Sequence, residues 1–154
     1  MALPDDLREL YQQVILDHSR SPRNQGQLSA DSCVHVHCDN PSCGDEIDLY
    51  IRFNDDGCIC DIKFEGQGCA ISQASTSMMT EKVKGISREE LIQLIQDLQQ
   101  TVLGQGEIQN PEALGELQLL EGVQKFPQRI KCALLGWRGL ESALSLGTKQ
   151  TFQA

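Results

Sequence analysis

The sequence predicts an α+β domain: a small antiparallel three-stranded sheet with helices packed on one face. Between residues 33 and 66, three short segments alternate apolar and polar residues, which is the period of a strand with one buried face. The segments before and after them repeat apolar residues at the spacing of an amphipathic helix. Strands grouped together and flanked by helices are typical of the α+β class.

Length and composition indicate one domain. With 154 residues, of which 40% are hydrophobic, the chain can bury its own core without disulfide bonds. We expect a single domain over residues 1–148 and a loose C-terminal tail over residues 149–154. The net charge of −9 argues against a nucleic-acid-binding protein, which needs a basic face.

The sequence predicts a cytoplasmic protein. It has no apolar run long enough to cross a membrane, and its first residues lack the basic and apolar regions of a signal peptide. Cysteines are kept reduced in the cytoplasm, so cysteines in such a chain bind metal, act chemically or are simply buried.

The first predicted element is a helix over residues 4–20, which begins with a proline and two acids. The three predicted strands cover residues 33–38, 45–53 and 58–66. The sequence NDDG between the last two suits a hairpin turn. In the third strand, strict alternation puts Cys58 and Cys60 on the apolar face. We expect Cys60 in the core and Cys58 beside the turn.

The second half of the chain is predicted to be helical. The helices are expected over residues 70–85, 87–104 and 126–147. Ser87 and Glu90 form a capping box, and Gly104 suits a helix end. Residues 105–124 are less regular and are predicted as a short helix or a loop. The run SQASTS in the first of these helices carries no neighbouring base, so its small residues are expected to allow close helix packing.

Three of the seven cysteines stand in contexts that favour chemistry. Cys43 lies in a turn-like sequence two residues before Asp45, so both side chains can project from the same strand face. Cys69 follows two glycines and opens a helix, where backbone amides favour a thiolate. Cys132 lies on the last helix. The remaining cysteines, for which the sequence assigns no chemical role, are Cys33, Cys38, Cys58 and Cys60.

Three thiolates and one carboxylate from separate elements would suit a four-coordinate site for Zn²⁺ or iron. Spacing alone leaves unrelated free thiols as the alternative. Arg129 precedes Cys132 by three residues and can reach the same helix face, where it could screen the charge of the site. His35 and His37 share one strand face and form a candidate ligand pair, although no further sequence feature points there.

Four segments resemble the iron–sulfur cluster assembly scaffold family, of IscU and NifU N-terminal type. They are LYQQVILDHSRSPRNQGQL, CDNPSCGDEIDLYI, FEGQGCAISQASTSMM and FPQRIKCALLGWRGLESAL. They span nearly the whole chain up to the tail, and the combination of CGD, GxGCAISxAS and the last cysteine is highly specific. The chain is most similar to the SufU branch. Lys131 stands where the IscU branch has a histidine ligand, the LPPVK chaperone-recognition motif is missing, and residues 100–122 include an extra stretch.

The resemblance implies the same α+β fold, of SufE/IscU type, and a site made of Cys43, Asp45, Cys69 and Cys132. It implies Zn²⁺ as the bound metal and Cys43 as the acceptor of persulfide sulfur from a pyridoxal-phosphate cysteine desulfurase of SufS type. Downstream iron–sulfur assembly or recipient proteins are the further expected partners. On this reading, any enzymatic activity is at most that of a zinc-dependent sulfurtransferase.

Two alternatives remain at this point. The site residues could instead hold iron or a [2Fe–2S] cluster, as in an IscU-type scaffold. A hydrolytic zinc enzyme is the less favoured alternative, because catalytic zinc sites keep three protein ligands and an open water position. The sequence motifs here supply four ligands and no nearby histidine or glutamate base.

Overall fold

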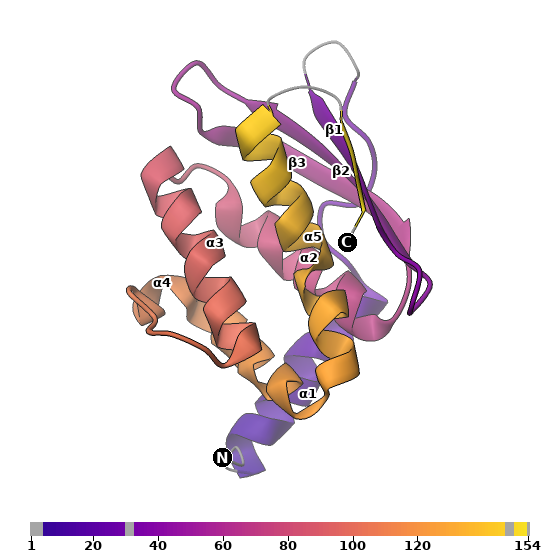
Figure 1. Ribbon diagram of the computed structural model, residues 1–154, viewed down its shortest axis with the longest axis vertical. Helices are drawn as coiled ribbons and strands as arrows, with labels where there is room; N and C mark the ends of the chain where they lie inside the picture. The colour runs from indigo at the N-terminus through magenta and orange to yellow at the C-terminus, as the bar shows by residue number, and fades with distance from the viewer. Residues whose placement is uncertain (1–4, 30–32, 147–149, 154) are drawn as a thin grey trace.

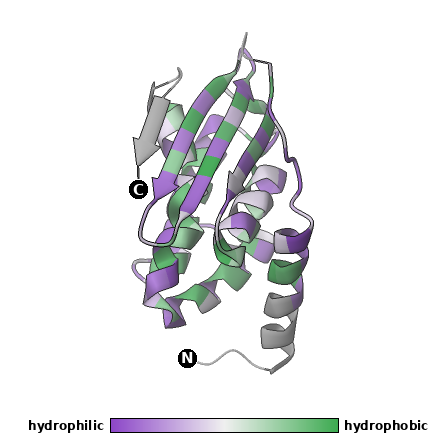
Figure 2. Ribbon diagram, turned by 90° about the vertical axis from the view of Figure 1, so that its right-hand side faces the viewer, coloured by the Kyte–Doolittle hydropathy of each residue, from purple (hydrophilic) through white to green (hydrophobic). Residues whose placement is uncertain are grey.

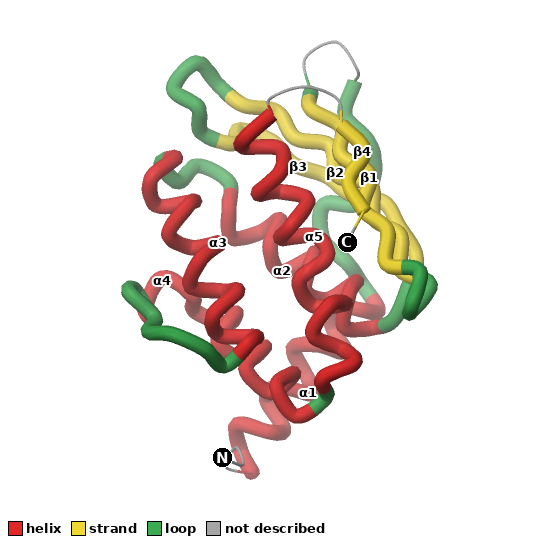
Figure 3. The backbone as a smooth tube through the Cα atoms, in the orientation of Figure 1, coloured by secondary structure: helices red, strands yellow, loops and turns green. Residues whose placement is uncertain are grey.

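The computed structural model describes residues 5–29, 33–146 and 150–153. The strands are β1 (Val34–Asn40), β2 (Asp45–Phe53), β3 (Ile59–Gln67) and β4 (Gln150–Gln153). The helices are α1 (Asp5–Arg20), α2 (Ala70–Val83), α3 (Arg88–Leu103), α4 (Pro111–Leu114) and α5 (Pro127–Leu146), with a 3-10 segment, η2, over Gly115–Lys125. The helices lie on one side of the sheet (Figures 1 and 3), which confirms the predicted α+β class. None of the described helices is long and apolar enough to cross a membrane.

The inner face of the sheet forms one wall of the core. β1 and β3 each pair antiparallel with β2, so that Val36 lies opposite Leu49, and Leu49 opposite Phe64. All three side chains are fully buried. Their neighbours along the strands point to the other face, which Figure 2 views directly. Polar and apolar residues alternate along the strands, as predicted.

The prediction that Cys60 lies in the core is wrong, because β3 contains a bulge. Phe53 pairs with Ile59 and Arg52 pairs with Asp61, so Cys60 is an extra residue without a partner across the ladder. The bulge shifts the alternation by one residue, and Ile59 takes the buried position instead. The Cys60 thiol is exposed and donates to the carbonyl oxygen of Arg52 at 3.3 Å.

The helix α2 packs between the sheet and the other helices, and its buried face is unusually polar. Its small side chains allow close approach, since a Cβ atom placed at Gly136 of α5 would lie only 2.6 Å from Oγ1 of Thr76. Ser75 donates to the carbonyl of Ala133 at 2.7 Å and accepts from Nε1 of Trp137 at 3.0 Å. Ser75 and Thr76 of the SQASTS run therefore serve packing, as predicted from the sequence.

The sheet has a fourth strand that the sequence did not predict. Residues Gln150–Gln153 form β4, which pairs parallel with β1 at the edge of the sheet, with Phe152 opposite Cys38. Within the expected tail of residues 149–154, the described residues Gln150–Gln153 form this strand, while residues 149 and 154 lie outside the described residues. The physical reason is that the outer edge of β1 leaves backbone donors and acceptors for a further strand.

His18 connects α1 to α2 in the interior. The residue is 4% exposed, and its Nδ1 lies 2.7 Å from Oγ of Ser77. That hydroxyl also accepts the backbone N–H of Arg23, so it can donate its own hydrogen to the imidazole. Burial lowers the pKa of His18 below its ordinary value of 6.5.

This burial predicts a loss of stability in mild acid. The unfolded chain takes up the His18 proton near pH 6.5, before the folded chain does, so the stabilisation is complete above that pH. It is lost as the pH falls from there toward the lower pKa of the folded state. We expect the melting temperature of the wild type to fall between pH 7.5 and pH 5.5 and that of His18→Gln to fall less. Equal pH dependence in the two proteins would contradict the assignment.

Candidate metal centre

Three potential metal ligands meet at one end of the sheet. Cys43 lies in the turn between β1 and β2, Asp45 is the first residue of β2, and Cys132 lies in the second turn of α5. A sulfur atom of each cysteine and a carboxylate oxygen of Asp45 all lie within 4.8 Å of one another. Two sulfur ligands of one tetrahedral zinc ion stand about 3.8 Å apart, so a small contraction would bring these atoms onto one ion.

Cys69 joins the same group from the start of α2. It is the N-cap residue of that helix, and its backbone N–H donates to Oδ1 of Asp45 at 2.9 Å. Its thiol is one of the groups whose hydrogen bonds and charge act on Cys132. The structure thus brings Cys43, Asp45 and Cys132 together and places the backbone of Cys69 against Asp45. Cys69 stands slightly apart from the compact group formed by Cys43, Asp45 and Cys132.

The carboxylate of Asp45 is held in a fixed position. Asp45 is fully buried, and its Oδ1 accepts from the Cys69 backbone and from the Ser72 hydroxyl at 3.2 Å. The Asn40 side chain donates to Oδ2 at 3.4 Å and approaches the sulfur of Cys132 at 3.9 Å. Asn40 and Ser72 were not identified from the sequence. Ser72 stands one helical turn after Cys69, a spacing that could have indicated it.

The two glycines before Cys69 make room for this arrangement. A Cβ atom at Gly68 would lie 2.2 Å from Oδ1 of Asp45, and Gly68 has a φ of +152° that other residues rarely adopt. A Cβ atom at Gly66 would lie 2.2 Å from the carbonyl oxygen of Glu46 on the neighbouring strand. The glycines therefore let β3 and the start of α2 close tightly over Asp45.

The electrostatics of the group favour a cation. Burial raises the pKa of the Cys132 thiol, and hydrogen bonds with Asp45 and Cys43 together with the charge of Cys69 raise it further. A bound cation would reverse this effect and displace the thiol proton. The pKa of the exposed Arg129 is raised by a hydrogen bond with Cys132 and by the charge of Cys69, so Arg129 lies beside the group. Lys131, the residue before Cys132 in the helix, is exposed.

The thiols of the group differ in accessibility. Cys43 and Cys69 are partly exposed, whereas Cys132 is fully buried. Cys43 sits in a turn where its N–H donates to the Asn40 carbonyl at 3.2 Å, and Gly44 follows it with a φ of +70° and open space around its Cα. Cys43 is therefore accessible and carried by a turn beside an unobstructed glycine, whereas Cys69, although also partly exposed, is held at the N-cap of α2 by the bond from its N–H to Asp45.

The other cysteines lie elsewhere. Cys38 is buried under α5, and burial raises the pKa of its thiol to about 12, so it is a protonated core residue. Cys33 is partly buried, and its thiol lies 3.9 Å from the carbonyl of Leu28. Cys58 is partly buried at the start of β3. All seven cysteines are free thiols.

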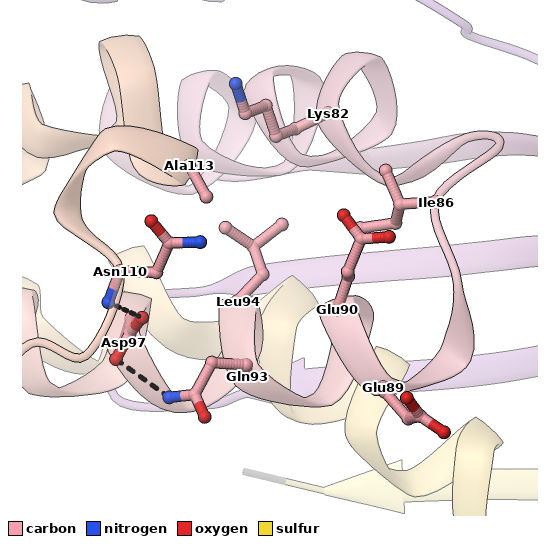
Figure 4. Close-up of a pocket in the computed structure, with 9 residues that line it drawn as sticks. All are labelled: Lys82, Ile86, Glu89, Glu90, Gln93, Leu94, Asp97, Asn110 and Ala113. Carbon is pink, nitrogen blue, oxygen red and sulfur yellow. Dashed lines mark hydrogen bonds between the residues drawn. The ribbon is translucent and has the colours of Figure 1, made fainter.

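A hollow of about 420 Å³ lies away from the cysteines, between α2, α3 and α4 (Figure 4). Its lining includes Leu94 and the buried carboxylate of Asp97. Asp97 accepts from the side chain of Gln93 at 3.1 Å and from the backbone of Asn110 at 3.0 Å. These bonds tie the irregular stretch of residues 105–124 to α3. The Asp97 carboxylate, the most buried charged group of the hollow, is thus occupied by hydrogen bonds that hold the fold together. The cysteine site is therefore the better candidate for a functional site.

Comparison with known proteins gives a consistent picture. Residues 10–133 match the NifU-like N-terminal domain. The chain is 48% identical over 140 residues, which are 90% of this chain and 84% of the relative, to the iron–sulfur cluster assembly scaffold protein IscU of Streptococcus pyogenes serotype M1. It is 43% identical over 145 residues, which are 94% of this chain and 96% of the relative, to the zinc-dependent sulfurtransferase SufU of Bacillus subtilis.

A solved structure extends the likeness to three dimensions. A putative iron–sulfur cluster assembly scaffold protein for the SUF system, from Fervidobacterium islandicum AW-1, superposes with a TM-score of 0.77 at 38% identity. The match covers 89% of this chain and 98% of that one. The chain therefore belongs to the NifU-like N-terminal domain family, the iron–sulfur cluster assembly scaffolds of IscU and SufU type.

Proposed function

We propose that this protein binds one Zn²⁺ through Cys43, Asp45, Cys69 and Cys132, and that Cys43 accepts sulfur from the persulfide of a pyridoxal-phosphate cysteine desulfurase of SufS type. The observation that carries the proposal is the contrast among the thiols of the site. Cys43 is partly exposed on a turn, whereas Cys132 is fully buried in a helix. The seven free thiols agree with the reducing cytoplasm as the place of action.

The donor set fits Zn²⁺. Soft thiolates together with one carboxylate in a tetrahedral arrangement suit zinc, and the buried Asp45 is oriented by Asn40 and Ser72. When bound, the ion would keep the surrounding thiols deprotonated. Asp45 accepts three hydrogen bonds and is therefore the ligand least able to move. It would retain the ion while Cys43 leaves, and a residue of the desulfurase would fill the vacated position.

The transfer itself is a thiol–persulfide exchange. The Cys43 thiolate attacks the outer sulfur of the donor persulfide, the sulfur–sulfur bond of the donor breaks, and the donor cysteine departs as a thiolate. Cys43 is left as a persulfide, so one sulfur atom moves without net oxidation or reduction. The chain supplies the accessible nucleophile, and Gly44 supplies the backbone freedom that lets Cys43 swing outward. Arg129, beside the site, would screen the negative charges that approach one another.

The names of the relatives include both sulfur transfer and the alternative function, cluster assembly on a scaffold. The Bacillus subtilis relative is named a zinc-dependent sulfurtransferase, and the Streptococcus pyogenes relative is named a scaffold. For a scaffold, a [2Fe–2S] cluster would be the cargo of the same four residues. Lys131, next to Cys132, favours the transfer function because it is exposed and cannot serve as the histidine ligand of the IscU branch. Downstream assembly or recipient proteins would take the sulfur or the cluster.

A hydrolytic zinc enzyme is less well supported. The compact ligand group found among the described residues contains two thiols and Asp45, with no histidine or glutamate that could act as a general base. With Cys69 added, the coordination of a tetrahedral ion is complete. A closed four-ligand site leaves no position for a reactive water.

Metal analysis combined with a desulfurase assay tests the proposal. Protein purified without oxygen is expected to hold about one Zn²⁺ per chain. It should stimulate cysteine turnover by a SufS-type desulfurase and should hydrolyse no ester or amide on its own. Protein that carries a [2Fe–2S] cluster in place of zinc, and leaves the desulfurase rate unchanged, would favour the scaffold alternative.

Replacing Gly68 by alanine should disturb the site through its geometry. The new Cβ atom would collide with the Asp45 carboxylate, so the variant should lose most of its zinc and roughly 1–3 kcal/mol of stability. Gly85→Ala is a matched control, because Gly85 also has a positive φ, +81°, but no atom lies within 4 Å of the added Cβ. The control should lose stability and keep its zinc. Full zinc content in Gly68→Ala would contradict the geometry.

A further inference from the structure

The segment that leads into α5 exposes a large aromatic side chain near the cysteine site. Phe126 is 52% exposed, more than any other large hydrophobic residue in the part of the chain that the structure describes. It is the C-cap of η2 and precedes Pro127, the first residue of α5. Single exposed apolar residues are common on protein surfaces, so the surroundings of Phe126 decide whether it has a function.

The backbone of Phe126 is held in place. Its N–H donates to the carbonyl of the buried Val123 at 2.8 Å, and its own carbonyl accepts the N–H of Arg129 at 2.7 Å. Both bonds use backbone atoms only, so the half-exposed ring is not needed to hold the segment. An aromatic ring that is presented from a fixed backbone loses little conformational entropy when a partner covers it.

Phe126 lies close to the turn that carries Cys43. The sulfur of Cys43 lies 3.8 Å from the carbonyl oxygen of Gln128, which is only two residues after Phe126. Two residues of chain span at most about 7 Å. A specific protein–protein interface covers about 800 Å² of each partner. A protein that delivers a persulfide to Cys43 would therefore also cover Phe126.

The same stretch of chain is basic, although the protein as a whole is acidic. Between Glu121 and Glu141 the sequence has no acidic residue, whereas the whole chain has a net charge of −9. Three of the bases in this stretch are exposed, and none of them forms an ion pair with a carboxylate of the described residues. They are Lys125, Arg129 and Lys131.

We propose that Phe126 is the main docking residue for the cysteine desulfurase, and that its ring enters an apolar pocket bordered by acidic side chains of that enzyme. This inference rests on the proposed function, in which the desulfurase brings its persulfide to Cys43. A central aromatic residue surrounded by charged residues is a common source of binding energy in interfaces.

Charge supports an acidic partner surface and a single orientation. Lys125 and Lys131 flank Phe126 in the sequence and would attract carboxylates of the partner. The rest of the chain is rich in acids and would repel the same carboxylates. An acidic surface of the desulfurase is therefore attracted to this segment and repelled elsewhere, which directs it toward Cys43.

The binding test uses the zinc-loaded full chain and the desulfurase. Phe126→Ala should raise the dissociation constant of the complex by about tenfold or more, mainly through faster dissociation. Zinc content and melting temperature should stay close to those of the wild type, because the ring is half exposed and the backbone bonds remain. The concentration that gives half-maximal stimulation of the desulfurase should rise by the same factor, while the maximal rate is unchanged because Cys43 is present.

Ile92→Ala is the matched control for the loss of an exposed apolar side chain. Ile92 is 40% exposed and lies in the first half of α3. That helix begins near Gly57 of the β2–β3 hairpin, at the opposite end of β2 from Asp45. This variant should bind the desulfurase as tightly as the wild type.

A charge reversal tests the basic residues separately. Lys125→Glu should lower the association rate constant by about tenfold at low salt, and the difference should shrink at an ionic strength of about 0.5 M. Lys84→Glu changes the net charge equally, but Lys84 is the C-cap of α2, about 20 Å along that helix from Cys69 at its N-cap. It should change the association rate much less.

Four results would overturn the proposal. They are unchanged binding by Phe126→Ala, equally weakened binding by Ile92→Ala, no effect of Lys125→Glu on association, and a wild-type dimer that Phe126→Ala converts to a monomer. In the last case a second copy of the chain, and not the desulfurase, would cover the ring.

The variant Cys43→Ala separates this proposal from the proposed function. If Cys43 is not the sulfur acceptor, Cys43→Ala still stimulates the desulfurase, while Phe126→Ala still binds it weakly. If the docking residue alone is wrong, Cys43→Ala fails to stimulate and Phe126→Ala binds like the wild type. The absence of any complex between the wild type and the desulfurase would overturn both.

Discussion

Replacing Cys43 by alanine is expected to abolish the stimulation of a cysteine desulfurase while leaving complex formation intact. The substitution removes the one thiol of the site that is both partly exposed and carried by a turn. It leaves the surrounding backbone unchanged, because the Asn40 carbonyl still accepts the N–H of residue 43. Cysteine turnover should fall to the rate of the desulfurase alone, since no acceptor remains for its persulfide. The assay follows sulfide or alanine release, and binding is measured in parallel.

The control for this variant is Cys60→Ala. Cys60 is also an exposed thiol, but it lies at the bulge of β3, in the half of that strand remote from Cys69. Its removal should leave stimulation unchanged. If Cys43→Ala still stimulated the desulfurase, or if Cys60→Ala abolished stimulation, a thiol other than Cys43 would be the acceptor.

Replacing Cys69 by serine is expected to remove zinc and to lower the stability of metal-loaded protein by about 3–4 kcal/mol, the linkage expected when the ion is present at 100–1,000 times its dissociation constant. Cys69 is the N-cap of α2, and its side chain makes no capping hydrogen bond. Serine is a preferred N-cap residue, so the substitution alone should favour the helix. Any loss of stability in Cys69→Ser must then come from the lost metal.

Removing the metal separates the effect of zinc from the effect of the substitution on the helix. With a chelator present, Cys69→Ser should be at least as stable as the wild type, whereas with zinc present it should be clearly less stable. Thermal unfolding and zinc content are measured for both proteins in both conditions. A Cys69→Ser protein that keeps full zinc, while Cys60→Ser loses it, would show that the ligands are assigned to the wrong residues.

The regular elements were predictable because their patterns are uninterrupted. β2 occupies residues 45–53 as predicted, since its apolar and polar residues alternate without a break. The capping box of α3 is present, with the Ser87 hydroxyl accepting the N–H of Glu90 at 3.1 Å. Cys60 was misplaced because a bulge leaves no mark in the alternation itself. β4 was missed because a short polar segment becomes a strand only when a free sheet edge lies beside it.

The residues of the cysteine site could be identified from local motifs, but contacts between strands could not. Family motifs indicated Cys43, Asp45, Cys69 and Cys132, which lie on separate elements, and folding brings them to one end of the sheet. The pairing of His35 and His37 was visible in the sequence, but the Asp48 carboxylate, to which both imidazoles are hydrogen-bonded, was not identified as their shared partner. That partner depends on the register between β1 and β2, which a single sequence does not specify.

If Cys43 is the sulfur acceptor, the transferred sulfur must be found on its side chain. Zinc-loaded protein is incubated with a cysteine desulfurase and cysteine, the persulfides are trapped by alkylation, and peptides are mapped by mass spectrometry. We predict the additional sulfur on Cys43, with Cys69 and the buried Cys132 unmodified. Sulfur found on Cys69 or Cys132, with Cys43 unmodified, would contradict the account and favour a scaffold-type route.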